Sequence, residues 1–156
     1  MCAKCANLVQ NIVITESREQ IMQTTTHQFS PAFGHGFDGF IEFLRDQEAG
    51  ASTLSPKRFG DVLSIDVQTL AAQAHVHRNT ISRAPASESV QKFLREALRV
   101  MRAAHDLSGD VGRAIFWYRN EPLPPFGYKT AEQLVSEGRT EDVLRYVGSL
   151  EAGAAG

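Results

Sequence analysis

The residue types that could hold a metal ion are few in this sequence and lie far apart. Cys2 and Cys5 form a C-x-x-C pair near the start of the chain. A structural zinc site needs four ligands, and no second pair of cysteines or histidines occurs at the spacing that such sites use. We therefore interpret the two cysteines as a pair without a role, and we expect neither a metal site nor a cofactor.

The residue types that could perform catalysis are no better placed. An enzyme would need a nucleophile beside a base, a set of metal ligands or a phosphate-binding loop. No glycine-rich motif follows a strand, and the adjacent Glu141 and Asp142 are typical of acids in the first turn of a helix. None of the five histidines has a partner at ligand spacing: His27, His35, His75, His77 and His105. We expect no catalytic residues and a chain that is not an enzyme.

The run LAAQAHVHRNTISRAP, residues 70–85, indicates a different chemistry. A helix-turn-helix needs a small residue where its helices cross, here Ala71, and apolar residues that hold their angle, here Leu70, Val76 and Ile81. Side chains suited to bases and phosphates crowd the second half: His77, Arg78, Asn79, Thr80, Ser82 and Arg83. The run predicts a DNA-reading helix; a helix pair that keeps the fold without binding an operator stays the alternative.

Two residues depart from the usual helix-turn-helix pattern. His75 stands at the turn position usually given to glycine, where a positive φ is needed. His77 stands where a serine commonly caps the second helix.

Charge restricts where DNA could bind. The whole chain has a formal net charge of −2 and an isoelectric point near 6.2, so a broadly basic surface is excluded. Residues 54–105 hold eight Lys or Arg and four Asp or Glu, a local excess of +4 (eight minus four). We expect DNA contacts to come from this local face.

The elements that position these residues are predicted to be helices throughout, because no strand-like alternation of useful length occurs. A short amphipathic helix over 37–50, ending near Gly50, is expected to pack on the domain that comes after it. Ser55 and Asp66 are expected to cap the next two helices, and Pro85 to end the third. The most regular helical pattern runs from Ser87 to about Asp106, with a basic face of Lys92, Arg95, Arg99 and Arg102.

The sequence after residue 106 also predicts helices. Gly109 is expected to stop the long helix and Asp110 to cap another, before a proline-rich loop at 119–129. Thr130 and Gln133 read as a capping box, and a last helix begins at Thr140. We thus predict an all-α fold with three parts: a mostly disordered arm at 1–50, a helix-turn-helix region at 51–86 and a small helical domain at 87–156.

No apolar run approaches the ~20 residues that cross a bilayer. The start of the chain also lacks the small-residue cleavage pattern of a signal peptide. We expect a cytoplasmic protein with no membrane contact.

The C-terminal run AIFWYRNEPLPPFGYKTAEQLVSEGRTEDVLRYVGSLEAGAAG resembles the toxin-binding domain of the Xre/MbcA/ParS antitoxins. The resemblance covers roughly residues 87–153, and the helix-turn-helix at 55–85 precedes it as in that family; residues 1–50 lie outside it. The resemblance implies an all-helical antitoxin encoded beside a RES-domain toxin, an enzyme that destroys NAD. It also implies that the C-terminal domain covers the toxin's active site while the helix-turn-helix represses the shared promoter.

Specific positions carry this resemblance. Trp117, Pro122, Leu123 and Phe126 match a W…N-x-P-L…F pattern, whereas Gly127-Tyr128-Lys129 departs from the Gly-Gly or Gly-Arg of many members. The helical part matches at Thr130, Leu134, Gly138, Val143 and Leu144. The implied toxin-binding residues are Trp117, Arg119, Asn120, Pro122, Leu123, Phe126, Gly153, Ala155 and Gly156.

The same side chains allow a plainer interpretation. Leu134, Val143, Leu144 and Val147 are expected to fill the domain's own core, whereas Trp117 could serve either the core or a partner surface. The tail EAGAAG has too little side chain to fold by itself, so it could thread into an enzyme cleft or only fray.

The sequence thus supports two functions. The first is an antitoxin that neutralises a RES-type toxin by occlusion and represses its own operon as a homodimer or within a larger toxin–antitoxin complex. The alternative is a stand-alone transcriptional regulator whose C-terminal domain only dimerises.

Overall fold

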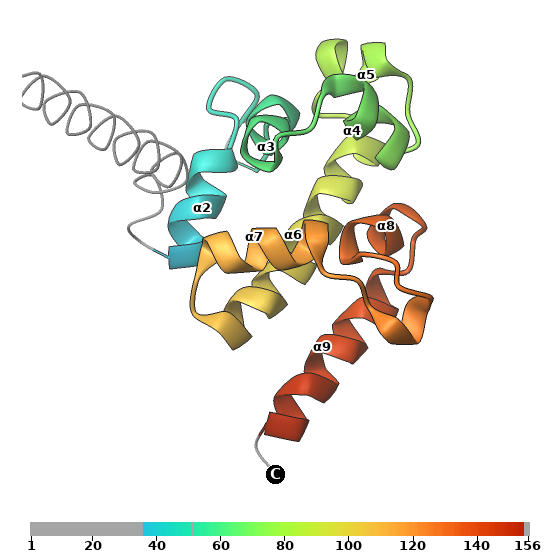
Figure 1. The fold of residues 1–156 in the computed structure, drawn as a ribbon. Coiled ribbons are helices and arrows are strands. Elements are labelled where there is room, and N and C mark those ends of the chain that lie inside the picture. The colour runs from blue at the N-terminus through green and yellow to red at the C-terminus, as the bar shows by residue number, and fades with distance from the viewer. Residues whose placement is uncertain (1–35, 51, 155–156) are drawn as a thin grey trace, which may run out of the picture. The chain divides into compact units, whose positions relative to one another are not determined.

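The computed structural model describes residues 36–50 and 52–154. Every regular element in this part of the chain is helical, so the all-α prediction is confirmed (Figure 1). In chain order these elements are α2 (Gly36–Leu44), α3 (Pro56–Leu63), α4 (Val67–Gln73), α5 (Arg78–Arg83), α6 (Glu88–Ser108), α7 (Val111–Asn120), the 3₁₀-helix η1 (Pro124–Phe126), α8 (Ala131–Ser136) and α9 (Thr140–Ala154). None of the described helices is long and apolar enough to cross a membrane.

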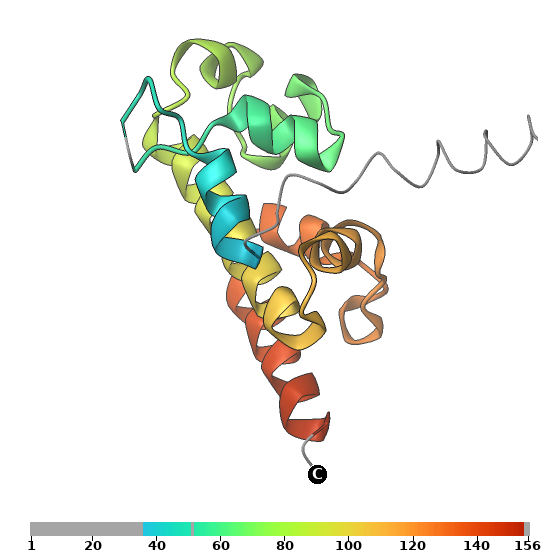
Figure 2. The same ribbon diagram turned by 90° about the vertical axis from the view of Figure 1, so that its left-hand side faces the viewer.

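Helix α6 is the element around which the others are arranged (Figure 2). Its buried side chains recur every three or four residues, and α3, α7, α8 and α9 pack against it. Val90, Leu94 and Ala97 are fully buried along this helix. The predicted regular helix from Ser87 is therefore the central helix of the core.

Local sequence signals place most helix starts. The side chains of Ser55 and Asp66 accept hydrogen bonds from the amides of Arg58 and Thr69, as expected of capping residues. The Thr69 amide also lowers the pKa of Asp66 below its ordinary value. Thr130 and Gln133 form the predicted capping box at the start of α8.

Helix α2 ends earlier than the helix that the sequence predicts over 37–50. Helix α2 stops at Leu44 rather than near Gly50, because the next residue, Arg45, forms an isolated antiparallel bridge with Leu54. The amide of Ser55 also donates to the carbonyl of Leu44 at 2.7 Å. These contacts fix the return of the chain into α3, and Phe37 and Phe40 join the buried core as the sequence predicted.

The core does not stop at the predicted domain boundaries. One cluster of buried side chains extends from Phe37 to Val147, and the residues that the structure describes form one compact unit. Buried Gln91 shows why: its Nε2 donates to the carbonyls of Leu54 and Pro85, both at 2.8 Å, and its Oε1 accepts from the Leu54 amide at 2.9 Å. Helices α3 to α5 and the C-terminal helices therefore share α6.

The C-terminal tail also differs from its expected form. Helix α9 continues through Glu151 to Ala154, so the first four residues of EAGAAG are helical. Ala155 and Gly156 lie outside the described residues, as do Cys2, Cys5, His27 and His35.

Candidate nucleic-acid interface

Helices α4 and α5 form a tight pair joined by the residues 74–77. Leu70 and Ala71 of α4 and Ile81 of α5 are buried between the pair and the rest of the core. These are the residues that the sequence predicted to hold the helices at their angle. The structure therefore shows two packed helices joined by a short turn, with α5 as the second helix.

The turn between these helices is a Schellman motif centred on His75. The amide of Val76 donates to the carbonyl of Ala71 at 3.0 Å, and the amide of His75 donates to that of Ala72 at 3.2 Å. His75 has φ +54°, in the left-handed region where glycine is usual. The positive φ that the sequence predicts at this turn is therefore present, and the residue that adopts it is His75.

His77 takes over the capping role that a serine commonly plays. It precedes α5 with an extended backbone, and its Nδ1 accepts a hydrogen bond from the Asn79 amide at 3.2 Å. This geometry requires an unprotonated Nδ1 in the cap. His77 therefore caps α5 at the position where a serine is usual.

The candidate base-reading residues are brought together on α5. All are exposed except Thr80, which is half-buried: His77, Arg78, Asn79, Ser82 and Arg83. Helical periodicity places Asn79 and Arg83 opposite the buried Ile81, so these two side chains extend furthest from the core. Arg78 and Arg83 have no hydrogen-bond or ion-pair partner among the described residues, so both guanidinium groups remain available.

The local positive charge is less uniform than the sequence indicated. Four of the eight cations in residues 54–105 are engaged within the fold. Arg99 pairs with Glu141 at 2.9 Å and with Glu96, and Arg102 pairs with Asp38 at 2.7 Å. Lys57 pairs with Asp61, and Arg58 donates to the carbonyls of Phe43 and Arg45. The cations without a partner among the described residues are Arg78, Arg83, Lys92 and Arg95, on α5 and the first half of α6.

A second candidate surface lies where the last turns of α6 and α9 meet α7. Leu107 of α6, Trp117 of α7 and Leu150 of α9 line an apolar hollow of about 320 Å³. Leu107 and Leu150 are exposed, Trp117 is half-buried, and neighbouring Phe116 is 64% exposed. We name these four residues the apolar end surface. The sequence pointed to Trp117. Helical spacing alone would place Leu107 and Leu150 in the core, whereas Phe116 lies off the buried face of α7.

The predicted toxin-binding residues do not all lie on one surface. Leu123 is only 1% exposed and belongs to the core. Arg119 is held inside the fold, because its guanidinium donates to the Leu63 carbonyl at the end of α3 and lies 3.6 Å from Glu132. These two side chains hold helices together in this structure and offer little to a partner.

The other predicted residues are more accessible. Asn120 and Pro122 are exposed at the end of α7, and Gly153 is exposed on α9. Phe126 is half-buried, with its ring edge-on to Tyr146 at 5.8 Å and with the Arg139 guanidinium 5.2 Å from its centre. Ala155 and Gly156 lie outside the described residues.

The loop where the sequence departs from the family pattern has an unusual backbone. Gly127 has φ +67° and Tyr128 has φ +62°, and the Tyr128 side chain is 70% exposed. The Leu123 amide donates to the Lys129 carbonyl across this loop at 2.9 Å. The loop therefore closes on itself and presents the Tyr128 ring outwards.

Over the residues that the structure describes, no group of three or more His, Cys, Asp or Glu side chains could hold a metal ion. Comparison with protein-family models, with curated proteins and with solved structures found no match to this chain.

Proposed function

We propose that this chain is an antitoxin that binds operator DNA through α5 and neutralises a partner toxin through its C-terminal helices. The observation that carries the DNA half is the exposed face of α5, where Arg78 and Arg83 have no partner within the described fold. Polar side chains on the second helix of such a pair suit base edges in the major groove, and cations suit phosphates. The toxin half rests on the sequence resemblance and on the apolar end surface.

The DNA half is tested by removing the α5 cations one at a time. Arg83→Ala and Arg78→Ala should each weaken binding to DNA taken from immediately upstream of the chain's own coding sequence. We expect a loss of about 1–3 kcal/mol per contact, or roughly 5- to 150-fold in Kd, measured by fluorescence anisotropy. Affinity of the unchanged protein should also fall steeply with salt, because phosphate contacts release counterions.

A matched control separates this effect from a loss of net charge. Arg145→Ala removes the same charge from an exposed position on α9, remote from α5 in sequence. Its DNA affinity should stay within about twofold of the unchanged protein, since exposed substitutions away from a site have small effects. Equal losses in all three variants would mean that α5 has no special part in DNA binding.

The toxin half is tested by co-expression with the product of the adjacent gene, which the proposal identifies as a RES-type enzyme that degrades NAD. Expression of that gene alone should arrest growth and deplete NAD, and co-expression of this chain should restore both. Leu150→Arg places a charge in the apolar hollow and should weaken complex formation at least tenfold in a pull-down titration. Ser149→Arg, one residue earlier and also exposed, is the matched control.

The alternative is a stand-alone regulator. Under that alternative the adjacent gene product has no effect on growth, and Leu150→Arg changes the association of the chain with itself. In the antitoxin proposal this chain supplies no catalytic group, and its role is to cover the catalytic site of its partner.

A further inference from the structure

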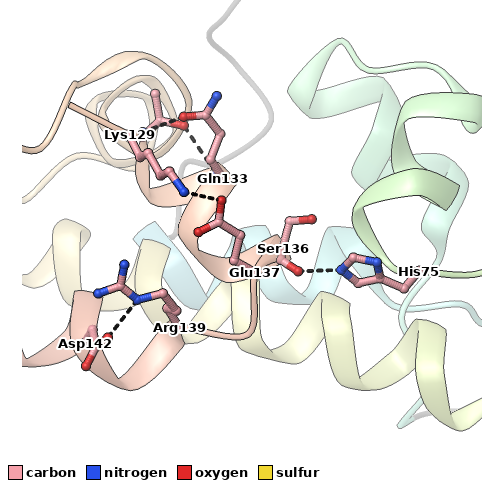
Figure 3. A network of polar contacts seen from close by, with 8 residues as sticks. His75, Lys129, Gln133, Ser136, Glu137, Arg139 and Asp142 are labelled. Carbon is pink, nitrogen blue, oxygen red and sulfur yellow. Dashed lines mark hydrogen bonds and ion pairs between the residues drawn. The ribbon is translucent and has the colours of Figure 1, made fainter. Parts of the chain in front are cut away.

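The turn of the helix-turn-helix and the end of α8 cap each other. Nε2 of His75 lies 2.6 Å from the carbonyl oxygen of Ser136, the last residue of α8 (Figure 3). In return, Oγ of Ser136 donates to the carbonyl of Gln73, the last residue of α4, at 3.1 Å. The last carbonyls of a helix have no partner within that helix, so each helix here satisfies a terminal carbonyl of the other.

The His75 side chain must donate in this arrangement, because the Ser136 carbonyl can only accept. The hydrogen bond is made by the one turn residue whose backbone is in the left-handed region. A glycine would adopt that φ with less strain but could not reach α8. The histidine therefore adds a contact that the turn itself does not require.

Helix α8 is in turn fixed at both of its ends. Thr130 and Gln133 close its capping box, and Lys129 pairs with Glu137 at 2.6 Å just after its last turn. Arg139 then pairs with Asp142 in α9 at 2.9 Å (Figure 3). The position of the Ser136 carbonyl is thus determined by the C-terminal part of the chain.

From this geometry we infer that His75 and Ser136 are positioning residues, through which α8 sets the placement of the DNA-reading helix α5. Neither residue needs to touch DNA for this role. The inference rests on the proposed function only in calling α5 the reading helix. Because coupling between sites is reciprocal, a partner that shifts α8 would change DNA affinity, and DNA would change affinity for that partner by the same factor.

The first test measures amide hydrogen exchange of α5 in the free full-length protein. His75→Gly keeps the φ of the turn and removes the hydrogen bond, so α5 amides should exchange about 5- to 10-fold faster, equivalent to about one hydrogen bond. The matched control is Ser64→Gly, because Ser64 ends α3 with a similar φ of +53°. This variant relieves the same kind of backbone strain and should leave α5 unchanged.

A second pair of variants tests the hydrogen bond from Ser136 to Gln73. Ser136→Ala removes the hydrogen bond to Gln73 and should also speed exchange in α5, whereas Ser149→Ala removes a serine-to-carbonyl hydrogen bond within α9. Upstream DNA should bind His75→Gly and Ser136→Ala about 5- to 10-fold more weakly than either control.

A double-mutant cycle tests whether the coupling passes through α8. Gln133→Ala breaks the capping box, and it should speed α5 exchange in the unchanged background. In the His75→Gly, Ser136→Ala background the same change should have no further effect on α5. Additive effects, or α5 exchange that matches the two controls, would overturn the inference. Failure of every variant and of the unchanged protein to bind DNA would overturn the proposed function, while the exchange measurements would still decide the coupling.

Discussion

The tyrosine of α7 places a polar hydroxyl in the buried core. Tyr118 is fully buried, and its hydroxyl has no hydrogen-bond partner among the described residues. Burial, with a smaller contribution from the negative charge of Glu132, raises the pKa of this hydroxyl well above its ordinary value. The group therefore stays protonated and contributes packing through its ring.

Removal of this hydroxyl should cost little or nothing. A buried polar group without a partner is unfavourable, and an apolar group of the same shape avoids that cost. Tyr118→Phe should leave the free energy of unfolding unchanged or raise it by up to about 1 kcal/mol, measured by urea denaturation. Tyr146→Phe, at a half-buried ring in α9, is the comparison. A loss of more than about 1 kcal/mol in Tyr118→Phe would show that the hydroxyl has a partner after all.

At the scale of elements, α6 is tied to its neighbours by one polar side chain as well as by its apolar face. Buried Gln91 uses both ends of its amide to satisfy the backbone of Leu54 and the carbonyl of Pro85. These groups lie just before α3 and just after α5. A leucine at position 91 would leave the two buried Leu54 groups and the half-buried Pro85 carbonyl without this partner.

Gln91→Leu should therefore destabilise the fold despite its greater hydrophobicity. Each of the two buried Leu54 groups costs about 1–3 kcal/mol when it has no partner, and the added apolar side chain offsets part of that sum. We therefore expect a loss of roughly 2–4 kcal/mol in the free energy of unfolding. Lys92→Leu, at the exposed neighbouring position, should change stability by less than about 0.5 kcal/mol. Similar values for the two variants would contradict the assigned role of Gln91.

Sequence reasoning succeeded where a local signal decides an element. Ser55, Asp66 and the Thr130–Gln133 pair cap helices as predicted, because a cap depends on residues within one turn. Glycines at 109 and 138 have the positive φ that ends α6 and α8. The α5 face was predicted for the same reason, since its exposed residues are consecutive in the chain.

The features that sequence reasoning missed depend on contacts between distant residues. The sequence predicts that Leu123 and Arg119 bind a partner, whereas Leu123 is buried and Arg119 donates to the carbonyl of Leu63. Neither fact is visible in local spacing. The contact from His75 to Ser136 spans 61 positions, and the pattern marked His75 only as an irregular turn residue. The end of α2 at Leu44 is likewise set by pairing with the strand-like segment at Leu54.

At the scale of the whole described unit, the shared core bears on how the protein unfolds. The sequence suggested a DNA-binding region and a separate C-terminal domain, yet a single buried cluster includes Phe59 of α3 and Val147 of α9. Helix α6 contributes to both halves of that cluster. We therefore expect that neither half keeps its core when the other is lost.

The unit should therefore unfold in one transition, with no state in which only α3 to α5 have unfolded. Trp117 is the only tryptophan and reports on α7, while Trp117→Phe combined with Phe59→Trp moves the reporter into α3. Urea midpoints from the fluorescence of each protein should match that protein's own far-ultraviolet circular dichroism. A separate early transition seen only from the α3 reporter would show that α3 to α5 form an autonomous domain. If all described helices unfold in one transition, a partner that binds the folded C-terminal helices raises the free energy of unfolding of the whole unit, and α5 is stabilised with it.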